Sequence, residues 1–178
     1  MRPWRPGQRK SDTASMLRVD QAGEYGATRI YAGQLAILRR NSPASKLVSR
    51  MADQEKRHLQ RFDALMSERR VRPTVLQPIW NVAGFALGAA TALMSEKAAM
   101  ACTEAVETEI DLHYGQQLDE LGSDDPELAT DIAQFRAEEL EHRDVARDAG
   151  AAQAVAYPLL TAAIRAGCRV AIGLSKRI

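Results

Sequence analysis

Apolar residues recur at steps of three and four positions along most of the chain, whereas the alternating apolar and polar runs of a β-strand do not occur. Residue types with high helix propensity, above all alanine, leucine, glutamate and arginine, dominate the same segments. The pattern predicts an all-α protein with six helices. Their expected ranges are residues 15–40, 43–70, 73–94, 95–121, 126–150 and 158 onwards.

The expected boundaries fall at residues that start or stop helices. Pro43 and Pro126 each follow a polar turn, and proline is favoured in the first turn of a helix. Ser95 is a suitable N-cap because its hydroxyl can accept a hydrogen bond from an amide of the first turn. We also expect Pro73 and Pro78 to begin the third helix.

The third and sixth expected helices are far more apolar than the other four. No charged residue lies between Arg72 and Glu96, and Arg165 and Arg169 interrupt the sixth helix, where they could extend to lipid headgroups. A membrane-spanning third helix and a helix buried in the domain are both alternatives. The alanine, glycine and polar residues of this segment favour a third interpretation, in which an apolar face enters one leaflet and the protein stays peripheral.

Residues 73–95 and the face carrying Leu159, Leu160 and Ile164 are therefore expected to form one membrane-facing surface. The Gly-x-x-x-Gly pattern at residues 84–88 is a weak indication of helix pairing, so a homodimer is one possibility.

The apolar stripes of the second and fifth helices each contain a glutamate and a histidine three residues apart. These pairs are Glu55 with His58 and Glu139 with His142. A residue on such a stripe faces the core, where an ionisable group is costly to bury without a partner. One Glu-x-x-His pair alone is usually an ordinary surface pair, but two pairs on two apolar stripes indicate metal ligands.

The chain also repeats itself. Glu24 lies 31 residues before Glu55, and Glu107 lies 32 residues before Glu139, so the sequence reads as two copies of one helical hairpin. Both Glu24 and Glu107 share a helical face with apolar residues and are expected to point inward. The four helices together then form a bundle with four glutamates and two histidines in its centre.

Four carboxylates and two neutral imidazoles carry a charge of about −4, which two divalent cations would neutralise. Mixed oxygen and nitrogen ligands suit iron or manganese better than zinc, which prefers fewer ligands. Iron is the stronger candidate because a pair of ferrous ions held by carboxylates can reduce dioxygen. We therefore expect two Fe ions.

Length and charge add two limits. The chain of 178 residues fits one domain, expected over residues 15–178, after a flexible basic tail of residues 1–14. Its 24 basic and 23 acidic residues nearly cancel, which disfavours a nucleic-acid partner. Cys102 and Cys168 lie in apolar helical contexts and are expected to be reduced thiols.

Segments around the predicted ligands closely resemble the demethoxyubiquinone hydroxylase family of ubiquinone biosynthesis. The resemblance extends from about residue 15 to the end of the chain. Its main segments are Leu-Arg-Val-Asp-Gln-Ala-Gly-Glu-Tyr-Gly-Ala at 17–27, Asp-Gln-Glu-Lys-Arg-His at 53–58, Ala-Met-Ala-Cys-Thr at 99–103, Glu-Glu-Leu-Glu-His at 138–142 and Ala-Gly-Cys-Arg-Val-Ala-Ile at 166–172.

The resemblance implies a ferritin-like four-helix bundle with a di-iron site and two further, membrane-facing helices. The ligands it implies are Glu24, Glu55, His58, Glu107, Glu139 and His142. Glu55 and Glu139 are expected to bridge the irons. Tyr114 lies two turns beyond Glu107, and Tyr114 and the neighbouring His113 are candidates for a role beside the irons or along the path of substrate or electrons.

The implied reaction is O2-dependent hydroxylation of the ring of demethoxyubiquinone or its quinol, a membrane-resident polyprenyl quinone. Two electrons are needed, and no Gly-x-Gly-x-x-Gly fingerprint occurs, so NADH and the quinol itself are both candidate reductants. The expected location is peripheral, on the cytoplasmic face of a bacterial inner membrane or the matrix face of the mitochondrial inner membrane. The sequence leaves open whether an accessory lipid-binding protein delivers the substrate.

Two rival functions use the same kind of centre. Ferritin-type iron storage or oxidation shares the helical hairpins and a similar ligand set, but the apolar third and sixth helices are unlike the surface of a soluble shell. The other rival is a di-iron oxygenase that acts on another lipid substrate.

Overall fold

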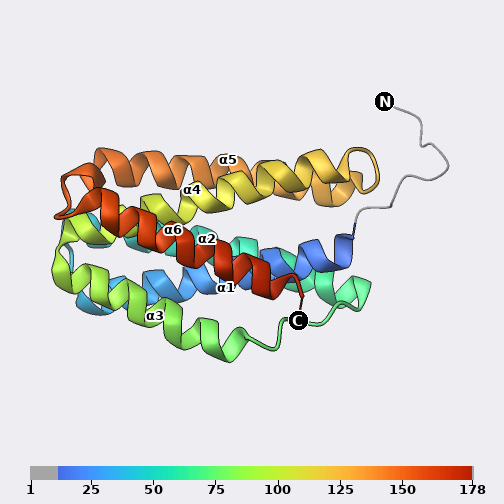
Figure 1. Cartoon of the computed structure of the whole chain (residues 1–178), viewed down its shortest axis with the longest axis horizontal. Helices are drawn as coiled ribbons and strands as arrows, with labels where there is room; N and C mark the ends of the chain where they lie inside the picture. Colours follow the sequence, from blue (N-terminus) through green and yellow to red (C-terminus); the bar gives the residue numbers. More distant parts are fainter. Residues whose placement is uncertain (1–11, 178) are drawn as a thin grey trace.

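The computed structural model describes residues 12–177, and this part of the chain contains helices and turns but no strand (Figure 1). The helices are α1 (Thr13–Ile37), α2 (Pro43–Arg69), α3 (Gln77–Met94), α4 (Glu96–Leu121), α5 (Pro126–Asp148) and α6 (Tyr157–Ser175), with a short 3-10 helix, η1 (Ala151–Gln153), before α6. The all-α prediction is confirmed for the described residues.

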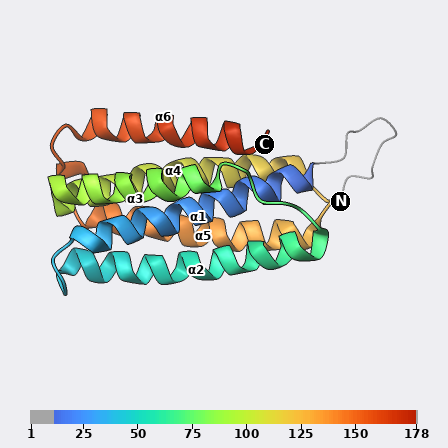
Figure 2. The same ribbon diagram turned by 90° about the horizontal axis from the view of Figure 1, so that it is seen from below.

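Two antiparallel hairpins, α1 with α2 and α4 with α5, form a four-helix core (Figures 1 and 2). Helices pack closely within each hairpin and make few backbone contacts between hairpins. Outside this core, α3 packs mainly on α1, and α6 packs mainly on α4. Figure 2 shows α6 on the opposite side of the molecule from α2.

The helix starts follow local capping chemistry. Ser95 caps α4, as predicted, by accepting a hydrogen bond from the amide of Ala98 at 3.0 Å. Asp12 and Asp125 cap α1 and α5 in the same way. Helix α1 begins at Thr13, two residues before its expected start, and the basic residues of the predicted tail lie outside the described part of the chain.

The predicted start of the third helix at Pro73 is wrong. Helix α3 begins only at Gln77, with Pro78 in its first turn. The preceding residues form a turn instead, in which the amide of Leu76 donates to the hydroxyl of Thr74 at 3.3 Å. The two prolines therefore have different roles, because Pro78 lies in the first turn of α3, where a missing amide hydrogen costs nothing, and Pro73 lies in the loop before this helix.

Glycines allow α3 to lie unusually close to α1. A Cβ atom added at Gly88 would lie 1.9 Å from the carbonyl oxygen of Ile30, and one at Gly33 would lie 2.1 Å from that of Phe85. Gly84 likewise approaches the backbone of Gly26. The small-residue pattern of α3 thus packs within the chain and gives no support to helix pairing between two copies.

Two apolar clusters fill the core above and below the predicted ligands. One contains Val48 and Met51 of α2, and the other contains Phe62 and Leu65 of the same helix, so Glu55 and His58 lie between them. The same order holds along α1, α4 and α5. The ligands therefore lie midway along the bundle, where both ends are sealed by packed side chains.

Helices α3 and α6 expose much of their apolar surface. Exposed side chains include Val82 and Leu93 of α3, and Leu159 and Val170 of α6. None of the helices in the described part of the chain has both the length and the apolarity that crossing a membrane requires. The prediction that Ile164 belongs to the membrane-facing surface is wrong, because this side chain is buried against α4.

The predicted extension of two arginines toward lipid headgroups is also not what the structure shows. Arg165 and Arg169 of α6 both lie beside Glu109 of α4, with nitrogen to oxygen distances of 2.5 and 3.4 Å. Glu109 is buried, and its negative charge attracts both guanidinium groups. These ion pairs link α6 to α4 of the four-helix core.

Candidate metal centre

The six predicted ligands converge at the centre of the four-helix core. Their helices are α1 for Glu24, α2 for Glu55 and His58, α4 for Glu107, and α5 for Glu139 and His142. Each of these side chains is at most 2% exposed. Four carboxyl groups buried together are very costly unless cations or protons compensate them.

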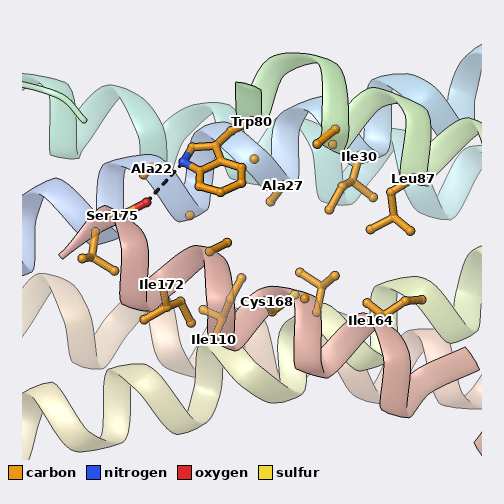
Figure 3. Close-up of a pocket in the computed structure, with 18 of the residues that line it drawn as sticks. Ala22, Ala27, Ile30, Trp80, Leu87, Ile110, Ile164, Cys168, Ile172 and Ser175 are labelled. Carbon is orange, nitrogen blue, oxygen red and sulfur yellow. Dashed lines mark hydrogen bonds between the residues drawn. The ribbon is translucent and has the colours of Figure 1, made fainter. Parts of the chain in front are cut away.

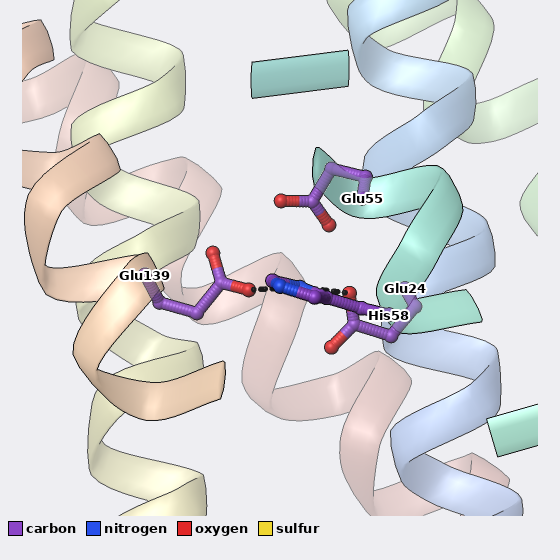
Figure 4. A group of neighbouring side chains, drawn as sticks. All are labelled: Glu24, Glu55, His58 and Glu139. Atoms are coloured by element: carbon purple, nitrogen blue, oxygen red, sulfur yellow. Dashed lines mark ion pairs between the residues drawn. The ribbon is translucent and has the colours of Figure 1, made fainter. Parts of the chain in front are cut away.

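The ligand atoms form two overlapping groups, of which Figure 4 shows the one that contains Glu24 and His58. Glu24, Glu55, His58 and Glu139 form one, and Glu55, Glu107, Glu139 and His142 form the other, with all ligand atoms of a group within 4.8 Å of one another. Glu55 and Glu139 belong to both groups. The geometry thus offers two adjacent metal positions with these two carboxylates between them.

Unpaired oxygen atoms mark the same place. Among the described residues, five buried carboxyl oxygens of this cluster accept no well-aligned hydrogen bond, although three of them lie within 3.5 Å of the Nδ1 atom of His58 or His142: Oε2 of Glu24, both oxygens of Glu55, Oε2 of Glu107 and Oε1 of Glu139. Buried polar atoms in native proteins nearly always have a partner. A pair of metal ions would satisfy these oxygens, so the donor set fits such a pair.

Without metal, the cluster must hold extra protons. Burial, and then the negative charge of Glu139, raise the pKa of Glu55 well above the usual range, and the same two causes raise the pKa of Glu107. The raised pKa values favour the protonated form of both carboxyl groups in the metal-free protein. Two divalent cations would take the place of these protons, so metal binding is expected to release them.

His58 and Glu139 behave in the opposite way because they stabilise each other. Burial lowers the pKa of His58, but the carboxylates of Glu139 and Glu24 outweigh it and raise this pKa to about 11. For Glu139, burial raises the pKa, yet hydrogen bonds from His142 and His58 outweigh burial and lower it to about 2. The Nδ1 atom of His58 lies 3.0 Å from Oε1 of Glu139 and 3.5 Å from Oε2 of Glu24 (Figure 4).

Two buried tyrosines hold the unshared glutamates from the opposite hairpin. The hydroxyl of Tyr31 on α1 donates to Oε1 of Glu107 on α4 at 2.6 Å, and the hydroxyl of Tyr114 on α4 donates to Oε1 of Glu24 on α1. Tyr114 was a candidate from the sequence, but Tyr31 was missed. The repeat could have indicated Tyr31, because Tyr31 and Tyr114 are separated by 83 residues, as are Glu24 and Glu107.

Two further residues that sequence reasoning missed hold the histidines. The Nε2 atom of His58 lies 2.9 Å from Oε2 of Glu138, and the Nε2 atom of His142 lies 3.0 Å from Oε1 of Gln54. When each Nε2 carries the donated hydrogen, each Nδ1 is left free to bind a metal. Gln54 directly precedes Glu55, and Glu138 directly precedes Glu139. Their places beside the two shared glutamates could have indicated them from the sequence.

His113 does not reach the metal centre. Its Nε2 atom lies 3.4 Å from Oδ1 of Asp20, and the same oxygen accepts a hydrogen bond from the amide of Gln117 at 2.8 Å. His113 is therefore part of a separate buried polar group between α1 and α4. The ring centroid of Tyr114, whose hydroxyl contacts Glu24, lies 6.2 Å from that of His113.

Comparison with known proteins decides the family. The model of the family described as ubiquinone biosynthesis protein COQ7 matches residues 11–175. The chain belongs to this family.

Several curated relatives share most of the chain. The 3-demethoxyubiquinol 3-hydroxylase of Rhodospirillum rubrum is 57% identical, over 91% of this chain and 76% of the relative. The human mitochondrial NADPH-dependent 3-demethoxyubiquinone 3-hydroxylase is 54% identical, over 92% and 76%. The mitochondrial 5-demethoxyubiquinone hydroxylase of Saccharomyces cerevisiae is 45% identical, over 92% and 77%.

This member of the COQ7 family also contains an apolar cavity of about 530 Å³, bounded by α1, α3, α4 and α6 (Figure 3). Gly23 and Val106, the neighbours of Glu24 and Glu107 in sequence, both line it. Leu160 of α6 also lines the cavity, so this residue is not part of the exposed face predicted from the sequence. The cavity thus lies on the outer side of α1 and α4 at the level of the metal ligands.

Proposed function

We propose that this protein hydroxylates the ring of demethoxyubiquinone or its quinol, using O2 and a pair of iron ions. The observation that carries the proposal is the pair of overlapping ligand groups that share Glu55 and Glu139. The family match and the printed names of the relatives supply the substrate class. No other observation in the described residues favours a different reaction.

The six buried residues would hold the metal pair as follows. Glu24 and His58 belong to one position, Glu107 and His142 to the other, and Glu55 and Glu139 to both. When bound, a pair of ferrous ions supplies the electrons and the Lewis acidity that activate O2. The apolar clusters at both ends of the centre exclude water and thereby protect the reaction from side products.

The cavity is the proposed site of the quinone. Its lining is dominated by aliphatic side chains and glycine, which suits an isoprenoid tail and an apolar ring. Gly26 and Gly167 leave open space where a Cβ atom would lie, so the lining is wide at these points. A ring in this cavity would approach the irons between α1 and α4.

The exposed apolar side chains of α3 and α6 lie on the two helices that bound this cavity. We propose that they contact one leaflet of a membrane, so that the quinone tail passes directly from lipid into the cavity. Several relatives are named mitochondrial, which is compatible with an inner-membrane surface as the site of action.

Isotope incorporation tests the proposed reaction. The protein, reconstituted with Fe(II) under anaerobic conditions, is mixed with a short-tailed demethoxyquinol, NADH or NADPH, and 18O2. We expect about two iron ions per chain and a product that carries one 18O atom in a ring hydroxyl, detected by mass spectrometry. Omission of the nicotinamide with the quinol present distinguishes the two candidate reductants.

The control for this experiment replaces Glu55 and His142 together by alanine and compares the result with Glu141→Ala, an exposed glutamate on α5. We expect the double variant to lose iron and product, and Glu141→Ala to retain both. Unlabelled product, or no product from an iron-loaded protein, would refute the hydroxylase. Uptake of many more than two iron ions per chain would support iron storage instead.

The cavity is tested by filling it. Gly167→Leu should slow turnover of the quinol, because the added side chain occupies the space that the substrate needs. Gly173→Leu is the matched control, since Gly173 lies on the same helix and does not line the cavity. Equal rates for the two variants would place the substrate elsewhere.

A further inference from the structure

The two histidines of the centre are held by a symmetric pair of contacts between α2 and α5. Glu138 of α5 accepts from His58 of α2, and Gln54 of α2 accepts from His142 of α5, at 2.9 and 3.0 Å. Gln54 and Glu138 are separated by 84 residues, as are His58 and His142. The two contacts thus occupy equivalent places in the two halves of the repeat.

The chemistry of these equivalent places is different. Glu138 presents a carboxylate to His58, and its other oxygen accepts from Gln134 at 3.1 Å while the guanidinium of Arg57 lies 4.0 Å away. Gln54 presents a neutral amide to His142. One histidine is therefore paired with an anion and the other with an uncharged group.

We propose that this difference makes the two metal positions unequal, with the Glu24 and His58 position binding Fe(II) more tightly than the Glu107 and His142 position. The inference rests on the proposed function, since it concerns the same metal pair. Glu138 and Gln54 act as positioning residues, because each acts on the metal only through a histidine.

The physical reason is the donor strength of the imidazole. A ring whose N–H donates to a carboxylate gains electron density at the other nitrogen and becomes a stronger metal ligand than one that donates to an amide. The negative charge of Glu138 would also attract a cation bound at the other nitrogen of the same ring. Such outer partners typically change metal affinity by roughly 10- to 100-fold.

The ring environment adds to the difference. His58 stacks on Phe135, with ring centroids 4.1 Å apart, so its orientation is restrained on the face as well as at Nε2. The residue in the equivalent place of the other half is Met51, which has no ring. His58 is thus held in its ligating orientation by both a charged partner and an aromatic ring.

Single-position variants test the order of affinities. His142→Ala leaves the position of Glu24 and His58 with its own histidine, and His58→Ala does the same for the other position. Fe(II) binding is measured by anaerobic calorimetry, with helicity checked by circular dichroism. We expect the His142→Ala protein to bind its ion at least tenfold more tightly than the His58→Ala protein.

Exchanging the side-chain types at positions 138 and 54 tests whether the residue that contacts each histidine causes the difference in Fe(II) affinity. In the His142→Ala background, Glu138→Gln should weaken binding about tenfold or more, and in the His58→Ala background, Gln54→Glu should tighten it similarly. The matched controls are Glu141→Gln on α5 and Gln60→Glu on α2, both of exposed residues. These controls should change either affinity by less than threefold.

Mössbauer spectra of the full chain loaded with 57Fe(II) give an independent readout. We expect two ferrous doublets of equal area, of which Glu138→Gln shifts only one. Two ions per chain with single-position affinities within threefold, or affinities insensitive to Glu138→Gln, would overturn the inequality and leave the hydroxylase proposal standing. A wild-type chain that binds fewer than two ions would overturn both.

Discussion

Tyr31 lies against Glu107 in the interior, where a single hydroxyl supplies the hydrogen bond to a buried carboxyl oxygen. Burial, followed by the charges of Glu107 and Glu55, raises the pKa of Tyr31 well above its usual range, so this hydroxyl keeps its proton at any working pH. A phenol that keeps its proton donates the hydrogen bond and thereby orients the Glu107 side chain.

Replacement of Tyr31 by phenylalanine is predicted to destabilise the protein by about 1–3 kcal/mol, because Oε1 of Glu107 loses its donor in a dry environment. Denaturant titration of the metal-free protein measures the effect. Tyr25→Phe is the control, since Tyr25 is half-buried on the same helix and its hydroxyl has no hydrogen bond to another described residue. Equal stability of the two variants would show that the hydroxyl of Tyr31 contributes nothing.

The titration of the centre predicts how stability depends on pH. The pKa values of Glu55, Glu107 and His58 are all raised in the folded, metal-free protein, so the folded state holds more protons than the unfolded state above about pH 4.5 for the glutamates, and from about 6.5 to 11 for His58. Stability is lost with rising pH wherever the folded state binds more protons. The lowered pKa of Glu139 acts only below about pH 4.5 and does not oppose this trend.

We therefore expect the chelator-treated protein to melt at progressively lower temperature as pH rises from about 5.5 to 8.5. Saturating Fe(II) under anaerobic conditions should remove or reverse this slope, because metal binding favours the deprotonated carboxylates. Differential scanning calorimetry measures both series. A metal-free melting temperature that rises with pH over this range would contradict the assigned protonation states.

At the scale of helices, α3 is held by backbone proximity more than by large buried side chains. Its buried residues are only Gly88, Thr91 and Ala92. Gly88 is the critical one, because its Cα lies against the carbonyl of Ile30 on α1 with no room for a methyl group. The position of α3, and with it one wall of the cavity, depends on this contact.

Gly88→Ala is predicted to lower stability by about 1–3 kcal/mol, because the methyl group must push α3 away from α1. Gly173→Ala should have the opposite sign, a gain of about 0.5–1 kcal/mol, since no atom lies near its Cβ and alanine favours a helix. Urea denaturation compares the two variants. Iron content should be unchanged in both, because neither helix supplies a ligand, and a stable Gly88→Ala protein would mean that the helices can separate at no cost.

At the scale of the whole molecule, the buried cluster of glutamates and histidines and the exposed apolar side chains lie on different helices. The six candidate metal ligands lie within α1, α2, α4 and α5, whereas Val82 of α3 and Leu159 of α6 are 69% and 74% exposed. Apolar side chains gathered on two adjacent outer helices, next to an apolar cavity, are typical of a surface that contacts lipid or another protein.

Val82→Asp together with Leu159→Asp is predicted to release the protein from liposomes, because a charge in the leaflet is costly, and to slow turnover of a long-tailed quinone more than that of a short-tailed analogue. Ala133→Asp together with Ala137→Asp is the control, since it adds the same two charges to exposed positions on α5. Liposome flotation and the two turnover rates are the measurements. Undiminished flotation of the double variant would refute lipid contact through this surface.

The sequence correctly predicted the helices and the inward orientation of the six candidate ligands, because both are local properties. Glu55 and His58 share a helical face wherever the helix is found, and the 83- to 84-residue repeat carries that inference to the second hairpin. The start of α3 was mispredicted because a proline marks the first turn of a helix or the turn before it equally well, and only the hydrogen bonds around Thr74 distinguish the two.

By itself, the sequence thus determined the all-α class, the six candidate ligands and the family resemblance. Only the tertiary structure decided that Tyr31 and Glu138 reach Glu107 and His58 across the hairpins, and that Leu160 turns toward a cavity. These contacts join residues far apart in the chain, and periodicity reports which face of a helix is apolar but not which neighbour covers it. The packing of one helix on another supplies that missing information.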